Sequence, residues 1–404
     1  MKNLFSYHFV GLGFVGLTTA LAFSEKIKEI NAIETDKKKL YKIKNGEIPF
    51  FEPVLPKILK KNKKKINFSS NLMLEKNKIN IVFLSVGTPQ SKNGKINLTY
   101  VENFCKEIKK KYYKYKIYLF IKSTVIPGTV RNLKKKFFKN NKNIILISNP
   151  EFLREGYAWY DTKNAEKIVI GCDNKECFKN LKSIFKIFKN KKYYTSSSEA
   201  EFIKYSSNIF LSNLISLSNC LMMIGEKIGD INIHKVFKIV KKDNRWSGFP
   251  AKMNSYFHPG IGYGGYCLPK DTEAFYFQNK NNFIKEIIAT NKKVLKYQVN
   301  KILKEAKKFE SIVFLGVSFK SGTDDIRDSK PIEIIKSVIS KTRKNFEIID
   351  PLVSEININR KKIKILRSFK FKKNKLYVLL NDNKKYPRFF SDNKKNILNL
   401  RYSF

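Results

Sequence analysis

The chain has 404 residues, of which 42% are hydrophobic and 14% aromatic, enough apolar material to bury the cores of two or three domains. Its formal net charge is +47, but the basic residues are 72 lysines and nine arginines, scattered through nearly every polar stretch. Bidentate recognition of bases and phosphates prefers arginine, so the charge favours solvated surfaces over a nucleic-acid interface.

The sequence also argues against a membrane or secreted protein. No apolar run reaches the roughly 18–20 residues that span a bilayer, and the start of the chain lacks the cationic stretch of a signal peptide. The five cysteines include no CxxC pair and there are three histidines, which argues against a disulfide scaffold or a zinc site. We therefore expect a cytoplasmic protein that binds no metal, no nucleic acid and no membrane.

The first half of the chain alternates short apolar runs with lysine-rich helical patterns. This alternation is typical of a parallel sheet covered by helices on both faces. It predicts an α/β fold with an N-terminal Rossmann-type doubly wound sheet over residues 1–195. The predicted strands are residues 7–11, 30–34, 79–86, 118–123, 144–148 and 167–171.

The pattern changes at Ser196, where serines followed by Glu199 and Glu201 are typical of a helix start. A long, mostly apolar helical segment follows, and we predict a central all-helical domain over residues 196–299. Strand–helix alternation then resumes and predicts a smaller Rossmann-like α/β domain over 300–404. Its predicted elements are a linker at 301–309, strands at 312–317, 346–350 and 376–380, and a helix that begins near Pro331.

Gly11, Gly13 and Gly16 follow the first predicted strand and open a helix. Glycines at this spacing permit a tight turn and the close approach of a pyrophosphate, which then lies at the helix N-terminus. Glu34 ends the second predicted strand, 23 residues after Gly11. A carboxylate there accepts hydrogen bonds from the ribose hydroxyls and repels a 2′-phosphate, so the pattern predicts NAD rather than NADP.

Three further segments fall at predicted strand ends, where the ligand crevice of a doubly wound sheet lies. Thr88 follows one strand, and Ser123 and Thr124 follow the next. These hydroxyls are placed to line a cofactor pocket, with the capping of turns as the alternative. Glu151 and Glu155 follow the next strand again and suit the orientation of a substrate or water, or equally a charge pair at a helix N-terminus.

The most specific segment is the loop at 259–271, which reads PGIGYGGYCLPKD. Four glycines in six residues let the backbone wrap closely around a ligand, and Cys267 follows with Lys270 and Asp271 behind it. A thiol close to cations can act as a nucleophile. The alternative is a buried structural cysteine, the role that we expect for the other four. A dyad of Cys267 with His258 is a further alternative, below a histidine that packs the loop.

The motifs together resemble one known family. In chain order they are the glycine turn, the acidic strand end, the GTP segment at 87–89, the ST pair at 123–124, NPEFLREG at 149–156, Lys204 and Asn208 on one helix face, GYGGYCLPKD at 262–271 and the segment from Phe319 to Arg327. This set is similar to the UDP-glucose/GDP-mannose dehydrogenase family, and the resemblance extends from residue 1 to about residue 351.

The resemblance implies roles for individual residues. It implies catalysis by Cys267 as the nucleophile, with Lys204, Asp271, Glu151, Thr124 and Asn208 around it. It implies NAD binding by Gly11, Gly13, Gly16, Glu34, Lys39, Thr88, Thr124, Glu155, Lys270 and Arg327. It implies substrate binding by Glu151, Phe152, Leu153, Arg154, Glu155, Lys204, Asn208, Arg245, Tyr256, Phe257, His258, Pro259, Gly260, Gly264 and Lys320. Arg245 resembles an arginine offered to the neighbouring subunit's substrate, which implies a homodimer built on the central helices.

The activity that the resemblance implies is the four-electron, NAD-dependent oxidation of UDP-glucose to UDP-glucuronate through a cysteine thiohemiacetal and thioester. The alternative is the same chemistry on a UDP-N-acetylhexosamine or GDP-mannose, although Tyr266 and Lys270 favour glucose. Two other classes remain as alternatives: a two-electron hydroxyacid-type dehydrogenase that does not need Cys267, and a basic binding protein without catalysis.

Two positions depart from the family's pattern. Glu34 stands where the family usually has aspartate; it keeps the charge and reaches farther. His8 interrupts the aliphatic pattern of the first strand.

Overall fold

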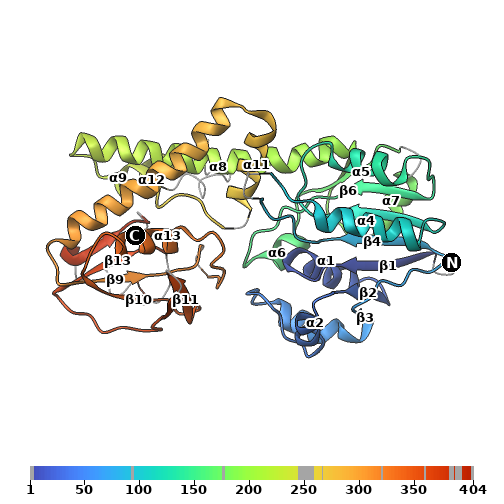
Figure 1. Cartoon of the computed structure of the whole chain (residues 1–404), viewed down its shortest axis with the longest axis horizontal. Helices are drawn as coiled ribbons and strands as arrows, with labels where there is room; N and C mark the ends of the chain where they lie inside the picture. Colours follow the sequence, from blue (N-terminus) through green and yellow to red (C-terminus); the bar gives the residue numbers. More distant parts are fainter. Residues whose placement is uncertain are drawn as a thin grey trace. The chain divides into compact units, whose positions relative to one another are not determined.

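The structure is a computed structural model that describes residues 4–91, 95–174, 178–243, 259–265, 267–319, 322–358, 361–381, 386 and 394–401. The chain divides into two compact units, Met1–Ser207 and Asn208–Phe404. The boundary falls inside helix α8 (Ser197–Ile228), which Figure 1 shows as one continuous helix. The division into domains at 1–195, 196–299 and 300–404 remains a prediction.

An eight-stranded sheet forms the frame of the first unit. Its strand order is β3-β2-β1-β4-β5-β6-β7-β8. Because the chain reverses its direction of travel across the sheet after β3, the carboxyl ends of β1 and β4 flank the position where ligands bind in doubly wound sheets. The strands are β1 (Phe5–Val10), β2 (Ile30–Ile33), β3 (Ile66–Ser69), β4 (Ile79–Leu84), β5 (Lys116–Ile121), β6 (Ile144–Ser148), β7 (Ile168–Gly171) and β8 (Lys192–Thr195).

The predicted doubly wound sheet is confirmed, with one difference from a purely parallel arrangement. β6 and β7 are antiparallel, whereas the other neighbours in this sheet are parallel. The helices of the first unit are α1 (Phe14–Ser24), α2 (Lys37–Lys44), α3 (Leu55–Asn62), α4 (Thr99–Lys111), α5 (Thr129–Phe138), α6 (Ala158–Lys163) and α7 (Phe178–Phe185).

Both faces of this sheet are buried, which explains why its strands are continuous apolar runs. On β4, Ile81 and Phe83 belong to one hydrophobic cluster, and Val82 and Leu84 belong to another. Successive side chains of a strand point to opposite faces, so each strand contributes to two cores. The polar residues that follow the strands are thereby left at the carboxyl edge.

The described part of the second unit contains the rest of α8, three further helices that precede a small sheet, and the sheet itself with the helix α13. The helices before the sheet are α9 (Ile233–Val240), α11 (Leu268–Asn279) and α12 (Asn282–Ala306). The sheet has the order β10-β9-β13-β14 and is parallel throughout. Its elements are β9 (Ser311–Leu315), α13 (Lys330–Ile339), β10 (Asn345–Ile349), β13 (Lys375–Leu379) and β14 (Ile397–Asn399), with a hairpin of β11 (Glu355–Ile358) and β12 (Lys361–Lys364).

The predicted linker at residues 301–309 is wrong for its first six residues. Residues 301–306 are the last turns of α12, and Ile302 and Ala306 are buried in the core of the second unit. The lysines between them made the segment look polar throughout, but their spacing leaves one apolar face. The strands β3, β8, β11, β12 and β14, each of three or four residues, are also absent from the predicted elements.

The predicted start of α8 is confirmed. The backbone N–H of Ser196 donates to Glu199 Oε2 at 2.8 Å, and the N–H of Glu199 donates to Ser196 Oγ at 3.3 Å. This reciprocal pair is a capping box. Within the described residues, α8 is the one helix long and apolar enough to cross a membrane by length and composition, and 39% of its most apolar window is buried.

Within the second unit, α8 has an inverted amphipathic pattern. The face packed against its neighbours is polar and contains Asn208, Ser212, Ser216 and Asn219. The opposite face is exposed and apolar, with residues spaced by three, four or seven along the helix so that they form one stripe. The stripe consists of Phe210, Leu217, Leu221, Ile224 and Ile228, each at least half exposed.

Candidate functional site

The predicted dinucleotide turn forms at the end of β1. Gly11 has a φ of +84°, and its N–H donates to the carbonyl oxygen of Ile33 at 2.9 Å. An added Cβ at Gly16 would overlap the carbonyl oxygen of Gly11, whereas one at Gly13 would meet no atom within 4 Å. The turn is therefore tightly packed behind and open at Gly13, so these residues fit a pyrophosphate at the N-terminus of α1.

Glu34 and Lys39 lie together beside this turn. Glu34 Oε2 accepts a hydrogen bond from the N–H of Leu12 at 3.0 Å, and Oε1 accepts one from the N–H of Asp36 at 3.1 Å. The ammonium of Lys39 is 2.7 Å from Glu34 Oε2. The carboxylate is thus fixed at the end of β2, in the place where it can meet a ribose.

The hydroxyls predicted at the next strand ends connect neighbouring loops. Thr88 Oγ1 donates to the carbonyl oxygen of Thr124 at 3.0 Å, and Ser123 Oγ donates to the carbonyl oxygen of Val86 at 2.6 Å. These bonds join the loop after β4 to the loop after β5. Thr88 is buried, so its hydroxyl fixes the shape of this edge of the sheet.

Sequence reasoning missed the role of Glu201 in holding this edge, although it used the residue as a helix-start signal. Its carboxylate accepts hydrogen bonds from the N–H groups of Gly128 and Val130 at 2.6 and 2.8 Å. Burial raises the pKa of this carboxyl to about 7. Glu201 thus caps the N-terminus of α5 from more than 70 residues away and ties the loop after Thr124 to α8.

Glu151 and Lys204 form a buried ion pair in the first unit. The ammonium of Lys204 is 3.2 Å from Glu151 Oε1, and the side chains are 6% and 8% exposed. Glu151 Oε2 also accepts a hydrogen bond from the N–H of Leu153 at 2.5 Å. Lys204 lies 5.4 Å from the ring centroid of Phe152. The NPEFLREG loop is therefore held against α8 by its first glutamate and by an aromatic ring.

A second buried lysine, Lys122, lies next to this loop and was not predicted. It directly follows β5, and its Nζ donates to Asn149 Oδ1 at 3.1 Å and to the Asn149 carbonyl oxygen at 3.4 Å. Burial lowers its pKa from the usual 10.5 to about 8, an effect that the charge of Lys204 strengthens and that of Glu151 opposes. Its position before Ser123 in a strand-end motif was the one available signal, and it was hidden among 72 lysines.

In the second unit, Cys267 stands at the N-terminal end of α11 and is exposed. Behind it, Asp271 is fully buried; it accepts a hydrogen bond from Asn208 Nδ2 at 2.6 Å and pairs with the ammonium of Lys270. The structure therefore brings Asn208, Lys270 and Asp271 together behind the thiol. A helix N-terminus favours negative charge at this position.

The glycine-rich loop before Cys267 is held by buried amide side chains that sequence reasoning did not single out. The N–H of Gly260 donates to Asn219 Oδ1 at 2.7 Å, and Gln298 Nε2 donates to the Gly260 carbonyl oxygen at 3.0 Å. Asn291 Oδ1 accepts from the N–H of Tyr263 at 2.8 Å, and its Nδ2 donates to the Tyr263 carbonyl oxygen at 2.9 Å. Three amides on α8 and α12 thus fix the loop.

The two predicted arginines in the described residues each have a local carboxylate partner. Arg154 binds Asp161, with its Nη2 at 2.6 Å from Oδ1, and Arg327 binds Asp325, with its Nε at 3.0 Å from Oδ1. Pro259 and Gly264 lie in the loop before Cys267, and Glu155 lies in the loop after Arg154. Five predicted substrate residues fall outside the described residues: Arg245, Tyr256, Phe257, His258 and Lys320.

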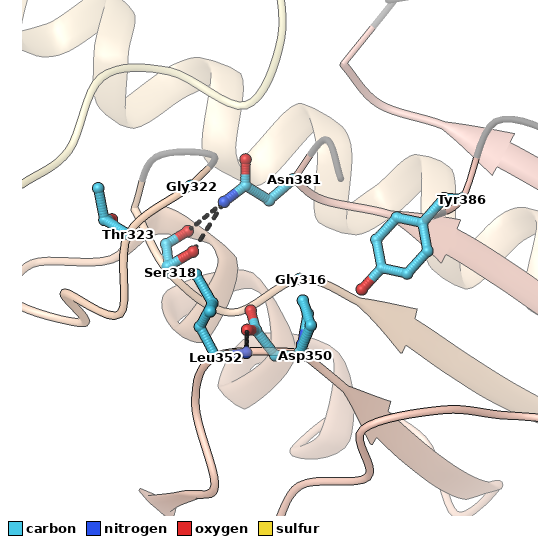
Figure 2. A pocket seen from close by; sticks show the side chains of 9 residues that line it. Gly316, Ser318, Gly322, Thr323, Asp350, Leu352, Asn381 and Tyr386 are labelled. Atoms are coloured by element: carbon cyan, nitrogen blue, oxygen red, sulfur yellow. Dashed lines mark hydrogen bonds between the residues drawn. The ribbon is translucent and has the colours of Figure 1, made fainter. Parts of the chain in front are cut away.

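A small hollow, partly open to solvent, lies at the carboxyl ends of β9, β10 and β13. Figure 2 shows two of its walls, where Asn381 Nδ2 donates to Ser318 and the carboxylate of Asp350 accepts from the N–H of Leu352. Asp350 is buried and also accepts from the N–H of Val317 at 2.8 Å. The amide of Asn381 and the carboxylate of Asp350 are therefore held by neighbouring groups of the protein.

Comparison with known proteins covers almost the whole chain. Models of the UDP-glucose/GDP-mannose dehydrogenase family match its NAD binding domain at residues 6–189, its central domain at 198–294 and its UDP binding domain at 313–402. UDP-glucose 6-dehydrogenase TuaD of Bacillus subtilis is 34% identical over 338 residues, which are 81% of this chain and 72% of that protein. UDP-glucose 6-dehydrogenase of Rickettsia bellii is 34% identical over 350 residues, 82% and 78% of the two chains.

Solved structures agree on the fold. The UDP-glucose dehydrogenase of Pyrobaculum islandicum aligns with a TM-score of 0.82 at 22% identity and covers 100% of this chain and 98% of that one. The UDP-D-ManNAc dehydrogenase of Pyrococcus horikoshii aligns with a TM-score of 0.81 at 19% identity and covers 97% and 93%. Enzymes named for different sugars therefore share this fold equally well, and the fold alone does not identify the sugar.

A Rossmann sheet with a fitted dinucleotide turn, joined to helical and UDP-binding segments, defines an NAD-dependent nucleotide-sugar dehydrogenase. The chain belongs to the UDP-glucose/GDP-mannose dehydrogenase family. The predicted NAD cofactor, nucleotide-sugar substrate and α/β fold are confirmed.

Proposed function

We propose that the protein oxidises UDP-glucose to UDP-glucuronate in a four-electron reaction with Cys267 as the nucleophile. The observation that carries the proposal is the exposed thiol at the start of α11 with Asn208, Lys270 and Asp271 directly behind it. The names of the two relatives at 34% identity support glucose as the sugar. The same chemistry on a UDP-N-acetylhexosamine or GDP-mannose is the alternative.

Two NAD molecules, bound one after the other, would each accept one of the two hydrides that leave C6, and the residues of the chain hold the sugar between those steps. The Cys267 thiolate adds to the C6 aldehyde and gives a thiohemiacetal, which retains a group that would react with water if it were released. Loss of the second hydride leaves a thioester. Water then breaks the carbon–sulfur bond, which releases the carboxylate and restores the thiol.

The charged residues have complementary tasks in this scheme. An oxyanion develops at C6 when the thiol adds and again when water attacks, and the Lys204 ammonium and the Asn208 amide are donors suited to it. Glu151 suits the orientation of the attacking water, with Thr124 beside it at the next strand end. Lys204 and Asn208 are one turn apart on α8.

The remaining predicted residues fall into two sets. The NAD set is proposed from the turn and the strand ends: Gly11, Gly13, Gly16, Glu34, Lys39, Thr88, Thr124, Glu155, Lys270 and Arg327. The substrate set is proposed from two loops and from residues outside the described part: Phe152, Leu153, Arg154, Pro259, Gly260, Gly264, Arg245, Tyr256, Phe257, His258 and Lys320.

Substitution of the thiol tests the covalent step. Cys267→Ala is expected to abolish formation of UDP-glucuronate, because no residue remains to hold the aldehyde stage. The matched control is Cys220→Ala on α8, a half-buried cysteine outside the site, which should retain wild-type turnover. Wild-type turnover by Cys267→Ala would instead indicate a two-electron dehydrogenase.

We also propose a homodimer in which the apolar stripe of α8 packs against the same stripe of a second copy. Exposing five large apolar side chains on one helix face to water is unfavourable, and the opposite face of α8 already carries buried polar groups. Each stripe is self-complementary across a two-fold axis. Leu221→Glu is expected to give monomers in sedimentation experiments, while the control Met73→Glu, at a 78% exposed residue between β3 and β4, should remain dimeric.

A further inference from the structure

Lys122 is a buried cation with neutral partners. The residue is 9% exposed and lies at the carboxyl end of β5, where its ammonium donates to the two oxygens of Asn149. Within the described part of the chain it forms no ion pair with a carboxylate. Burying an ammonium without a counter-charge is unfavourable, so its retention at this edge calls for a reason other than stability.

Its partner Asn149 fixes the start of the NPEFLREG loop. Asn149 directly follows β6; its N–H donates to the carbonyl oxygen of Ile121 at 2.9 Å, and its Nδ2 donates to the carbonyl oxygen of Val169 at 2.8 Å. The side chain therefore spans from β5 to β7, and Lys122 occupies its remaining acceptor. Glu151 stands two residues farther on, and its carboxylate pairs with Lys204.

Three buried charged groups thus meet at one edge of the sheet. Glu151 faces Lys122 from the loop after β6, and Lys204 faces it from α8. One carboxylate cannot neutralise two ammonium groups, and Lys204 is the lysine in direct contact with it. The positive charge of Lys122 therefore favours loss of a proton from Lys204.

We propose that Lys122 is the positioning residue of the Glu151–Lys204 pair: it holds the Glu151 loop through Asn149, and its charge tunes the protonation of the pair. The inference rests on the proposed roles of Glu151 and Lys204 in catalysis. Lys122 itself touches neither substrate nor cofactor in this scheme. Its effect is passed on through one hydrogen-bonded asparagine and through the electrostatic potential at the pair.

The test is the pH profile of kcat for nucleotide-sugar oxidation in the wild type, Lys122→Met, Lys122→Arg and Lys134→Met. Lys134 is the matched control, because its ammonium also binds backbone carbonyl oxygens, including that of Ile144 at 2.8 Å, but at the other end of β6. Lys122→Met is expected to lower kcat by roughly tenfold to a hundredfold, since misplacing a reacting group by about 1 Å can cost about a hundredfold. The alkaline limb of its pH profile should also shift to higher pH, because Lys204 loses its proton at a higher pH once the charge of Lys122 is gone.

Lys122→Arg keeps the positive charge at every pH and should not shift the limb to higher pH, and Lys134→Met should lower the melting temperature alone. A uniform loss of kcat at every pH in Lys122→Met, in parallel with its melting temperature, would reduce Lys122 to a structural residue and overturn the proposal. A wild-type profile in Lys122→Met would overturn it as well. A wrong substrate would be recognised separately: the wild type would not oxidise UDP-glucose but would oxidise another nucleotide sugar. The four pH profiles are then recorded with that sugar.

Discussion

β1 in the first unit and β9 in the second are each followed at once by a glycine in the left-handed region, Gly11 with φ of +84° and Gly316 with φ of +88°. The N–H of Gly11 donates to the last residue of the neighbouring strand, Ile33, at 2.9 Å. The N–H of Gly316 donates to the last residue of its neighbouring strand, Ile349, at 2.8 Å. The two sheets therefore each contain a backbone turn of the same geometry.

The carboxylates beside the two turns also correspond. The N–H of Leu12 donates to Glu34, and the N–H of Val317 donates to Asp350, each across to the residue after the neighbouring strand. Asp350 has its remaining capacity taken up by the N–H groups of Leu352 and Val353. Glu34 likewise accepts from the N–H of Asp36, and its Oε2 also contacts the ammonium of Lys39.

The two turns differ in the segment that comes after the glycine. In the first unit α1 begins at Phe14, so a helix N-terminus stands open beside the turn. In the second unit α13 begins at Lys330, and the intervening loop contributes Ser318 and Thr323 to the hollow there. The same strand frame thus provides a dinucleotide turn only where the helix begins at once, so the loop and not the fold determines the ligand.

The largest effect on stability is expected at Gly16, in the helix that begins directly after the first turn and has no counterpart after the second. A Cβ at Gly16 would overlap the carbonyl oxygen of Gly11, and backbone must move, so Gly16→Ala should cost more than about 4 kcal/mol of unfolding free energy. Thermal unfolding measures this. Gly13→Ala is the control, because its Cβ meets no atom within 4 Å; it should unfold like the wild type and raise the KM for NAD. Equal melting temperatures for both variants would refute a packed turn.

The second largest effect is expected at His8, which lies three residues before Gly11. The equivalent position in the second unit, three residues before Gly316, is Val313. His8 is buried; its Nε2 lies 3.2 Å from Asn80 Oδ1, and burial lowers its pKa from 6.5 to about 4. Between these values the unfolded chain binds the proton and the folded chain does not. Stability is therefore complete above pH 6.5 and falls by about 3 kcal/mol as the pH drops through 4. His8→Val should abolish this part of the pH dependence in urea unfolding at about pH 7.5, 6 and 5, and an unchanged pH dependence would contradict the account.

The smallest effects are expected for substitutions of the two carboxylates beside the turns, Asp350 and Glu34, and they should differ in kind. Asp350→Asn leaves a backbone N–H opposite an amide N–H and should cost about 2 kcal/mol of stability without changing the KM for NAD. Glu34→Gln should raise the KM for NAD about tenfold, because a charged acceptor for the ribose is lost. Steady-state kinetics and denaturant unfolding of both variants provide the measurement. An altered KM for NAD in Asp350→Asn would show that the two turns are more alike than their loops indicate.

Much of this arrangement could be predicted from sequence because its signals are local. The glycine turn, the carboxylate at a strand end and the cysteine loop are contiguous motifs, and the serine–glutamate start of α8 is a four-residue pattern. The long-range partners could not be predicted. Glu201 caps α5 across more than 70 residues, and the amides of Asn219 and Asn291 look like ordinary polar positions until the loop packs on them.

The most direct test of the central claim is the number of NADH molecules formed per UDP-glucose consumed, measured by absorbance with NAD in excess. Two NADH per sugar, with UDP-glucuronate as the product, is the expected result, because the alcohol must lose two hydrides to become an acid. One NADH per sugar would contradict the account: it would identify a two-electron enzyme and remove the reason for a nucleophile at Cys267.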